Sequence, residues 1–323
     1  MAVVFYHYTA RHDSSLYEAF SPFTQYGYLG VPLFFIISGY VIALSASNRS
    51  ATEFAVSRFV RLYPAYWSGI AITLVFASIY GSYEYNLIQV LANLTMLNDY
   101  LGIRNIDDVY WTLQAELKFY ACIFILVYFN YFAKHKIWLS IWLALTVLFL
   151  FTEQPSFLGI LISPFYSSFF IAGVAFYLIY KEGVNKYNMF IISVSLLVSS
   201  YWQYHLADEF IRDTDVFIKL VSVSIVWVFY VLFYLIVTDR IKLTSRKIYT
   251  TLGALTYPLY LIHGVAGRHM INDLRERIPE GIAVTITIAL MLFISYLVHK
   301  LIEKKTAPVI KRKLLNLLSR KTA

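Results

Sequence analysis

Apolar residues occur along this chain in long runs that are separated by short polar segments. Most runs are about 17–25 residues long, the length at which a helix crosses roughly 30 Å of hydrocarbon. The pattern predicts an all-α, polytopic integral membrane protein with about ten transmembrane helices. The predicted spans cover residues 1–10, 29–46, 62–80, 110–131, 137–152, 157–180, 187–202, 216–237, 249–269 and 281–302.

Two apolar segments are too short to cross a bilayer. Residues 1–10 would cover about 15 Å as a helix, so we expect the first transmembrane helix to be incomplete in this sequence. Residues 86–98 end in polar side chains, and we expect a re-entrant or surface segment there. We divide the chain into a transmembrane domain, 1–302, and a basic cytoplasmic tail, 303–323.

The composition agrees with a membrane protein. Hydrophobic residues make up 59% of the chain and charged residues 14%, with a mean hydropathy of +0.62. One soluble core cannot bury this much apolar surface, since soluble domains have about 25% charged residues. Cys122 is the only cysteine, which excludes an intrachain disulfide and metal sites built on cysteine.

Basic residues are distributed unevenly among the loops. Loops 47–61, 133–136, 181–186 and 238–248, with the end of the chain from 300, contain 19 of the 27 lysines and arginines. Because cytoplasmic loops are rich in these residues, we expect both termini in the cytoplasm and the protein in the plasma (inner) membrane. The net charge of +8 then reflects topology and contact with anionic membrane lipids, and not nucleic-acid binding.

Three ionisable residues inside the predicted spans are candidate catalytic groups. Counted from the span ends, His7, Glu116 and His263 all fall in the outer half of the membrane. Ionisable groups are costly there and often functional. Imidazole and carboxylate commonly act as a general base and the group that orients it. The alternative is a structural pair that joins helices.

Two further segments are candidate donor-binding sites. Arg58 and Arg61 are three residues apart, so they share one helical face at the inner mouth of a span, where Pro64 should break or bend the helix. Such a pair can hold phosphates, or it can simply anchor the span. The glycine-rich segment 27–40, with Ser38 and Gly39, allows close approach of a ligand or of another helix.

Five stretches of the chain occur in this order: "VVFYHY", "GVPLFFIISGY", "RFVRLYP", "VYWTLQAELKFY" and "LTYPLYLIH". Together they resemble the motifs of the membrane-bound acyltransferase 3 family. The match covers nearly the whole chain, with Thr112 in place of the serine that is usual in the family. The resemblance implies an O-acetyltransferase that uses cytoplasmic acyl-CoA, needs no metal, and modifies a hydroxyl of a carbohydrate or lipid-linked glycan.

The resemblance also implies roles for the candidate residues. Arg58 and Arg61 would hold the CoA phosphates, and the segment with Ser38 and Gly39 would line the path of the thioester. His7 would be the general base and Glu116 its orienting carboxylate.

Three points stay open. His263 has a less defined place, as a second base, an acceptor contact or a helix-packing residue. We expect the protein either to act alone or to pass its acyl group to a separate extracytoplasmic acyltransferase as a partner. The alternative function is a proton-coupled transporter or flippase of a glycan-related substrate, in which buried histidine and glutamate relay protons.

Overall fold

The structure is a computed structural model in which residues 1–10, 14–80, 84–152, 156–242, 244 and 246–319 are described. Helices account for 84% of the chain, and no strand occurs in the described ranges. The α-helices are α1 Ala2–Phe5, α2 Tyr17–Thr24, α3 Gly30–Ala46, α4 Ala51–Tyr80, α5 Leu87–Leu94, α6 Trp111–Tyr128, α7 His135–Phe151, α8 Ser156–Ile162, α9 Pro164–Glu182, α10 Lys186–Phe210, α11 Val216–Val237, α12 Lys247–Ile262, α13 Val265–Leu274, α14 Glu280–Val298 and α15 Ala307–Ser319. Short 3-10 helices cover Gln25–Leu29, Asn98–Leu101 and Asp108–Tyr110, and π-helices cover Tyr6–Ala10 and His299–Thr306.

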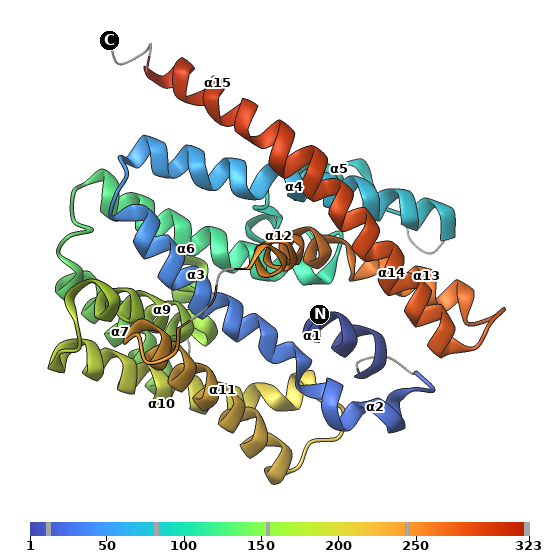
Figure 1. Ribbon diagram of the computed structural model, residues 1–323, viewed down its shortest axis with the longest axis horizontal. Helices are drawn as coiled ribbons and strands as arrows, with labels where there is room; N and C mark the ends of the chain where they lie inside the picture. The colour runs from blue at the N-terminus through green and yellow to red at the C-terminus, as the bar shows by residue number, and fades with distance from the viewer. Residues whose placement is uncertain (11–13, 81–83, 153–155, 243, 245, 320–323) are drawn as a thin grey trace.

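Helix α9 is largely buried and lies beside α3, α7 and α10 (Figure 1). Of its 19 residues, 14 are buried, and it packs against α3, α7, α10 and α11. Its crossing with α3 is close: a Cβ on Gly39 would lie 2.3 Å from Phe170 O, and one on Gly173 would lie 2.1 Å from Ile36 O. Only glycine permits backbones to approach this closely.

The prediction of an all-α membrane protein is confirmed. Among the described residues, five helical stretches are long and apolar enough to cross a membrane: Tyr17–Ala46, Ala51–Tyr80, Phe157–Glu182, Val216–Val237 and Glu280–Leu318. The other predicted spans do not reach this length and hydropathy together. The number of ten spans therefore stays a prediction.

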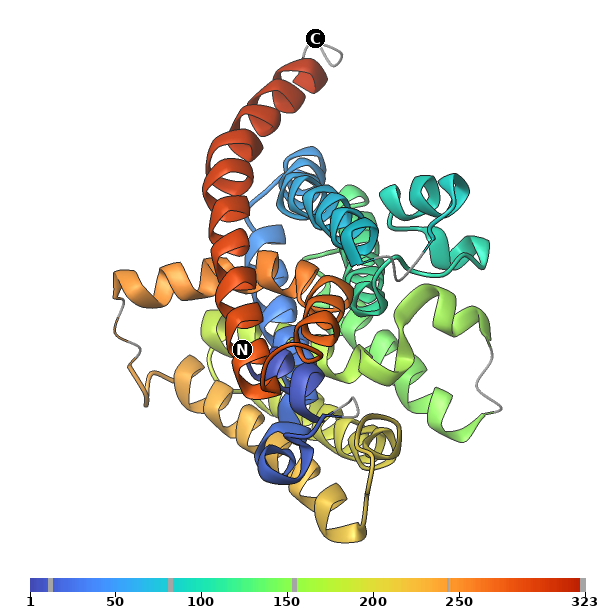
Figure 2. The same ribbon diagram turned by 90° about the vertical axis from the view of Figure 1, so that its right-hand side faces the viewer.

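Three of the predicted spans begin, end or break at other residues in the structure than the sequence predicts. α4 begins at Ala51 and continues through Pro64, so this proline does not break the helix. The span predicted at 157–180 is interrupted at Ser163, whose φ of 44° leaves the helical region before Pro164. The span predicted at 249–269 is divided by Gly264 into α12 and α13. In Figure 2, α12 lies crosswise to the long helix α14–α15.

The predicted boundary at residue 302 is not a break in the structure. α14, the π-helix His299–Thr306 and α15 follow one another without a loop, as the red helix in Figure 2 shows. One face of α15 packs on α4, where Ala307 contacts a cluster with Val56 and Val60. Arg320 and Lys321 of the predicted tail lie outside the described residues.

Candidate active site

The break between α12 and α13 forms the framework of the site. Carbonyls at the end of α12 lose their helical partners, and side chains bind them instead. The Tyr110 hydroxyl donates to Leu261 O at 3.1 Å, and the Tyr8 hydroxyl donates to His263 O at 2.9 Å. The His263 ring donates from Nδ1 to Tyr260 O at 2.8 Å. Residues from distant parts of the chain therefore hold this break in one geometry.

Asp107 fixes the other side of the break. Its buried carboxylate accepts hydrogen bonds from Val265 N at 2.6 Å and from Val109 N at 3.3 Å. A Cβ on Gly264 would lie 2.1 Å from Asp107 Oδ1, so only glycine leaves room for the carboxylate. Burial raises the pKa of Asp107 to about 6, and the charge of Arg268 opposes this increase. Asp107 thus joins the segment before α6 to the start of α13.

His7 and His263 lie against each other at the same break. Their imidazole centroids are 5.1 Å apart, with an angle of 65° between the rings. Because Nδ1 of His263 donates to a carbonyl, its Nε2 carries the lone pair. This Nε2 is buried and has no hydrogen-bond partner among the described residues. The sequence placed both histidines at one depth, and the structure brings them into contact.

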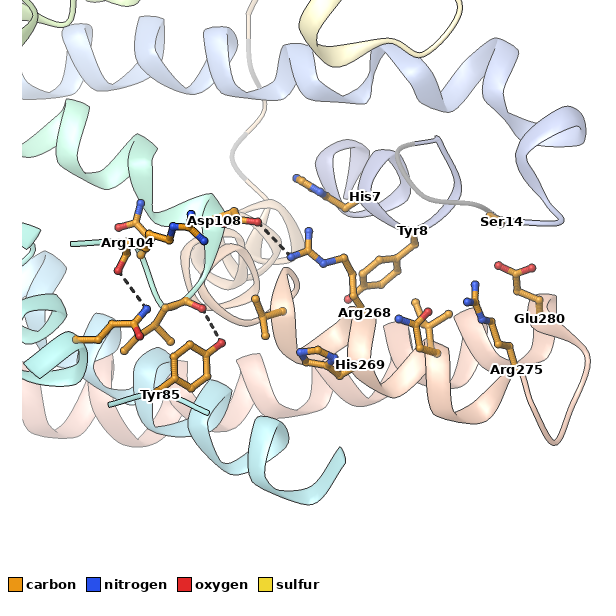
Figure 3. A pocket seen from close by; sticks show the side chains of 16 residues that line it. His7, Tyr8, Ser14, Tyr85, Arg104, Asp108, Arg268, His269, Arg275 and Glu280 are labelled. Carbon is orange, nitrogen blue, oxygen red and sulfur yellow. Dashed lines mark hydrogen bonds and ion pairs between the residues drawn. The ribbon is translucent and has the colours of Figure 1, made fainter. Parts of the chain in front are cut away.

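His7 lies between two cavities. The larger one, of about 690 Å³, is shown in Figure 3; we call it the outer cavity, because the loop charges predict this end to face outward. It lies among α13, the segment before α6 and the residues around Tyr8 and Ser14. The smaller one, of about 110 Å³, is the aromatic cavity, and His7 lines it as well. Its aromatic lining consists of Tyr6, Tyr28, Trp111, Tyr166, Phe210 and Tyr260.

Glu116 belongs to a separate polar cluster. Only 4% of the residue is exposed, and its Oε1 accepts hydrogen bonds from the Tyr120 hydroxyl at 2.5 Å and the Ser38 hydroxyl at 2.9 Å. The Arg58 guanidinium lies 5.7 Å from the centroid of the Tyr120 ring. Arg58 and Arg61 both act electrostatically on the carboxylate. Within the described ranges, Glu116 therefore bonds to hydroxyl groups and not to a histidine, which corrects the predicted grouping.

The two candidate donor-binding arginines have different partners. Arg61 Nη1 lies 2.6 Å from Glu303 Oε1, and the other Glu303 oxygen lies 2.6 Å from His299 Nδ1. Arg58 contacts the Ser57 hydroxyl at 3.0 Å, and its Nε is buried without a hydrogen-bond partner among the described residues. Arg61 is thus held by the C-terminal helix, while Arg58 keeps a free donor.

A comparison with protein families decides the class of protein. The family model Acyl_transf_3, described as an acyltransferase domain, matches residues 1–300. This chain belongs to the acyltransferase 3 family. The resemblance that the five motifs indicated is confirmed, and the protein is a membrane acyltransferase.

Curated relatives agree with this acyltransferase assignment. ORF330 of Acidianus two-tailed virus, named as a candidate acetyltransferase, is 25% identical over 271 residues, which cover 81% of this chain and 78% of that protein. The exopolysaccharide production protein ExoZ of Rhizobium meliloti (strain 1021) is 30% identical over 105 residues, or 29% of this chain and 32% of that protein. No solved structure matches the acyltransferase.

Gly39 has a packing role in the acyltransferase. It was predicted to contact the donor, but it lies in the close crossing of α3 and α9, and this contact accounts for a glycine there. Its neighbour Ser38 turns toward Glu116. In the described part of the chain, no three His, Cys, Asp or Glu side chains are grouped so that they could hold a metal ion.

Sequence reasoning missed three residues of this site. Asp107 belongs to an acidic pair with Asp108, just before the span predicted at 110–131. It was missed because the candidate catalytic groups were the ionisable residues inside the predicted spans. Tyr8 follows His7, but nothing in the sequence distinguishes it from the other tyrosines of this chain. Glu303 lies 242 residues from Arg61, and no pattern in the sequence connects the two.

Proposed function

We propose that this acyltransferase moves an acyl group, most simply acetyl, from cytoplasmic acyl-CoA to a hydroxyl of a carbohydrate acceptor such as a surface polysaccharide or lipopolysaccharide. The position of His7, which lines both cavities, carries the proposal. An acceptor in the outer cavity and an acyl group in the aromatic cavity would meet at its imidazole. The name of the relative ExoZ supports a carbohydrate acceptor.

The reaction needs one group that accepts and then returns a proton. His7 takes the proton of the acceptor hydroxyl as the oxygen attacks the thioester carbon. The C–S bond then breaks, and the imidazolium returns the proton to the leaving CoA sulfur. His263, whose Nε2 keeps its lone pair, is a neutral neighbour that tolerates the transient positive charge on His7 better than a cation would.

On the donor side, Arg58 and Arg61 hold the CoA phosphates. Guanidinium groups suit this task because they bind phosphate oxygens bidentately. Arg58 has no ion-pair partner among the described residues, whereas Arg61 must exchange Glu303 for phosphate. The product glycan leaves toward the outside of the plasma membrane, or a separate extracytoplasmic acyltransferase receives the acyl group.

The test compares base-labile O-acetyl groups on surface glycans from source cells with and without the gene. Cells with His7→Ala should lose acetylation as the deletion does, since a positioned base contributes about 10²–10⁴-fold in rate. His205→Ala is the matched control, because His205 is exposed and, among the described residues, its ring contacts those of Tyr201 and Tyr204. Unchanged acetylation in the deletion strain would reject the surface-glycan acceptor.

A second assay separates acyl transfer from transport. Purified protein receives acetyl-CoA with and without extracted glycan, and free CoA is measured. A transferase releases CoA only when an acceptor is present, and His7→Ala should abolish this release. Transport of the glycan without CoA release would favour the transporter instead.

A further inference from the structure

The outer cavity contains three arginines that come from two parts of the chain. Arg268 lies on α13, and Arg275 is the C-cap residue of this helix, seven positions later. At the helical rise they lie on one face, separated by about 10 Å, and both line the cavity. Arg104 comes from the segment before α6. Figure 3 shows Arg104 and Arg275 on opposite sides of Arg268, with His7 on the same cavity.

The carboxylates that face this cavity are already engaged. Glu280 accepts hydrogen bonds from the backbone N of Ser15 at 2.8 Å and from its hydroxyl at 2.5 Å. Asp108 lies 3.6 Å from Arg268 Nη2. None of the ion pairs between described residues involves the exposed Arg104. Among the described residues of the cavity wall, three arginines face two carboxylates, so positive charge is in excess. Arg104 has no ion-pair partner among these residues, which leaves its guanidinium for a ligand.

The rest of the cavity wall suits a sugar. Gln89, Asn105 and Asn272 are amides, which can both donate to and accept from hydroxyl groups. Gln89 Nε2 already donates to Arg104 O, so Gln89 would offer its oxygen. Asn105 Oδ1 already accepts from Gln114, so Asn105 would offer its NH₂. A volume of about 690 Å³ lies within the usual range for ligand sites. The cavity thus combines amides for hydroxyl groups with guanidinium groups for acids.

We infer that the acceptor is an acidic glycan, whose carboxylate or phosphate groups bind Arg104, Arg268 and Arg275 while a hydroxyl reaches His7. This inference rests on the proposed function and specifies its acceptor. Guanidinium groups bind both kinds of acid bidentately, and a cleft with excess positive charge raises the local concentration of anions. Acid groups on successive residues of a glycan match a row of arginines better than an isolated charge does.

The experiment fractionates the natural acceptor. Glycans extracted from source cells are separated by anion exchange into a neutral and an acidic pool, and each pool is offered to the purified acyltransferase with acetyl-CoA. We expect CoA release with the acidic pool. Chemical reduction of carboxyl groups or phosphatase treatment of this pool should abolish its activity, and the effective treatment identifies the acid.

Variants connect the charge preference to the cavity. Arg104→Gln and Arg275→Gln should each raise the KM for the acidic pool about tenfold, as expected for loss of a charge-assisted hydrogen bond, with kcat largely retained. Arg277→Gln is the matched control: it removes the same charge two residues further on, where Arg277 pairs with Asp273 at 2.9 Å and does not line the cavity.

The outcomes separate the two claims. CoA release with the neutral pool alone overturns the acidic acceptor and leaves acyl transfer intact. Activity with the acidic pool that changes equally in Arg104→Gln, Arg275→Gln and Arg277→Gln overturns the assignment of the arginines. Absence of CoA release with both pools overturns the proposed function itself.

Discussion

Replacement of Asp107 tests how the helix break supports the site. Asp107→Ala removes an acceptor from Val265 N, at 2.6 Å, and the cap on Val109 N, at 3.3 Å. A hydrogen bond to a charged group contributes about 1.5–3 kcal/mol, and loss of a cap costs about 0.5–2 kcal/mol. Burial of the carboxylate costs free energy and offsets part of these contributions. We therefore expect Asp107→Ala to lower the unfolding free energy by about 2–4 kcal/mol.

Asp107→Asn should behave differently because its amide oxygen can still accept from Val265 N. The amide NH₂ would face Val109 N, so only the weaker bond is lost, at a cost of about 1 kcal/mol. The kcat should likewise fall less in Asp107→Asn than in Asp107→Ala. Displacement of His263 or Arg268 by about an ångström in Asp107→Ala should lower kcat by about 10²-fold.

The raised pKa of Asp107 adds a pH dependence with a defined sign. The carboxyl titrates near 3.9 in the unfolded chain and at about 6 in the folded protein. Between these values the folded state binds more protons, so the contribution of Asp107 to stability is largest below about pH 4 and falls as the pH rises to about 6. Above pH 6 this contribution is constant.

Thermal unfolding in detergent, measured from pH 4 to pH 7, checks this reasoning. The melting temperature of wild type minus that of Asp107→Asn should decrease over this range and then level off. A difference that is flat, or that increases with pH, would refute the titration of Asp107. A melting temperature of Asp107→Ala equal to that of wild type would refute its place in the helix break.

Three further changes test other parts of the molecule. Glu303→Gln releases Arg61 from its ion pair, so the KM for acetyl-CoA should fall several-fold; an increase would mean that Glu303 positions Arg61 for the donor. Gly39→Val should lower the melting temperature sharply, because its Cβ meets Phe170 O at 2.3 Å and overpacking costs about 1–3 kcal/mol; a melting temperature like that of wild type would contradict the close crossing. Glu116→Ala should destabilise more than Glu116→Gln, since the glutamine oxygen still accepts from the two hydroxyl groups; equal melting temperatures would remove this role.

Local sequence patterns predicted much of the fold. The span at 216–237 was placed at its observed bounds, because its apolar run is bounded by Asp215 and by polar residues after Val237. The division at Gly264 was missed because its cause is remote: the carboxylate of Asp107, 157 positions away, occupies the space where a side chain would be. A helical propensity gives no information about such a contact.

The candidate site was predicted in part. Depth along the helices predicted that His7 and His263 lie at one level, and they are in contact. The same counting grouped Glu116 with them, but depth does not specify the direction in which a side chain points around its helix. Glu116 points toward Ser38 and Tyr120. The catalytic and donor-binding roles of these residues stay predictions.

The residues that hold the helix break are different from the arginines that line the outer cavity, so substitutions in the two sets should have different effects. Asp107, Tyr8 and Tyr110 hold the end of α12 and the start of α13 in place. In contrast, Arg268 on α13 and Arg275 at its C-terminal end line the outer cavity. Substitutions on this cavity wall can change which acceptor binds while the imidazole pair keeps its position. A library that varies only residues 268, 272 and 275 is therefore a compact way to search for variants with a changed acceptor preference.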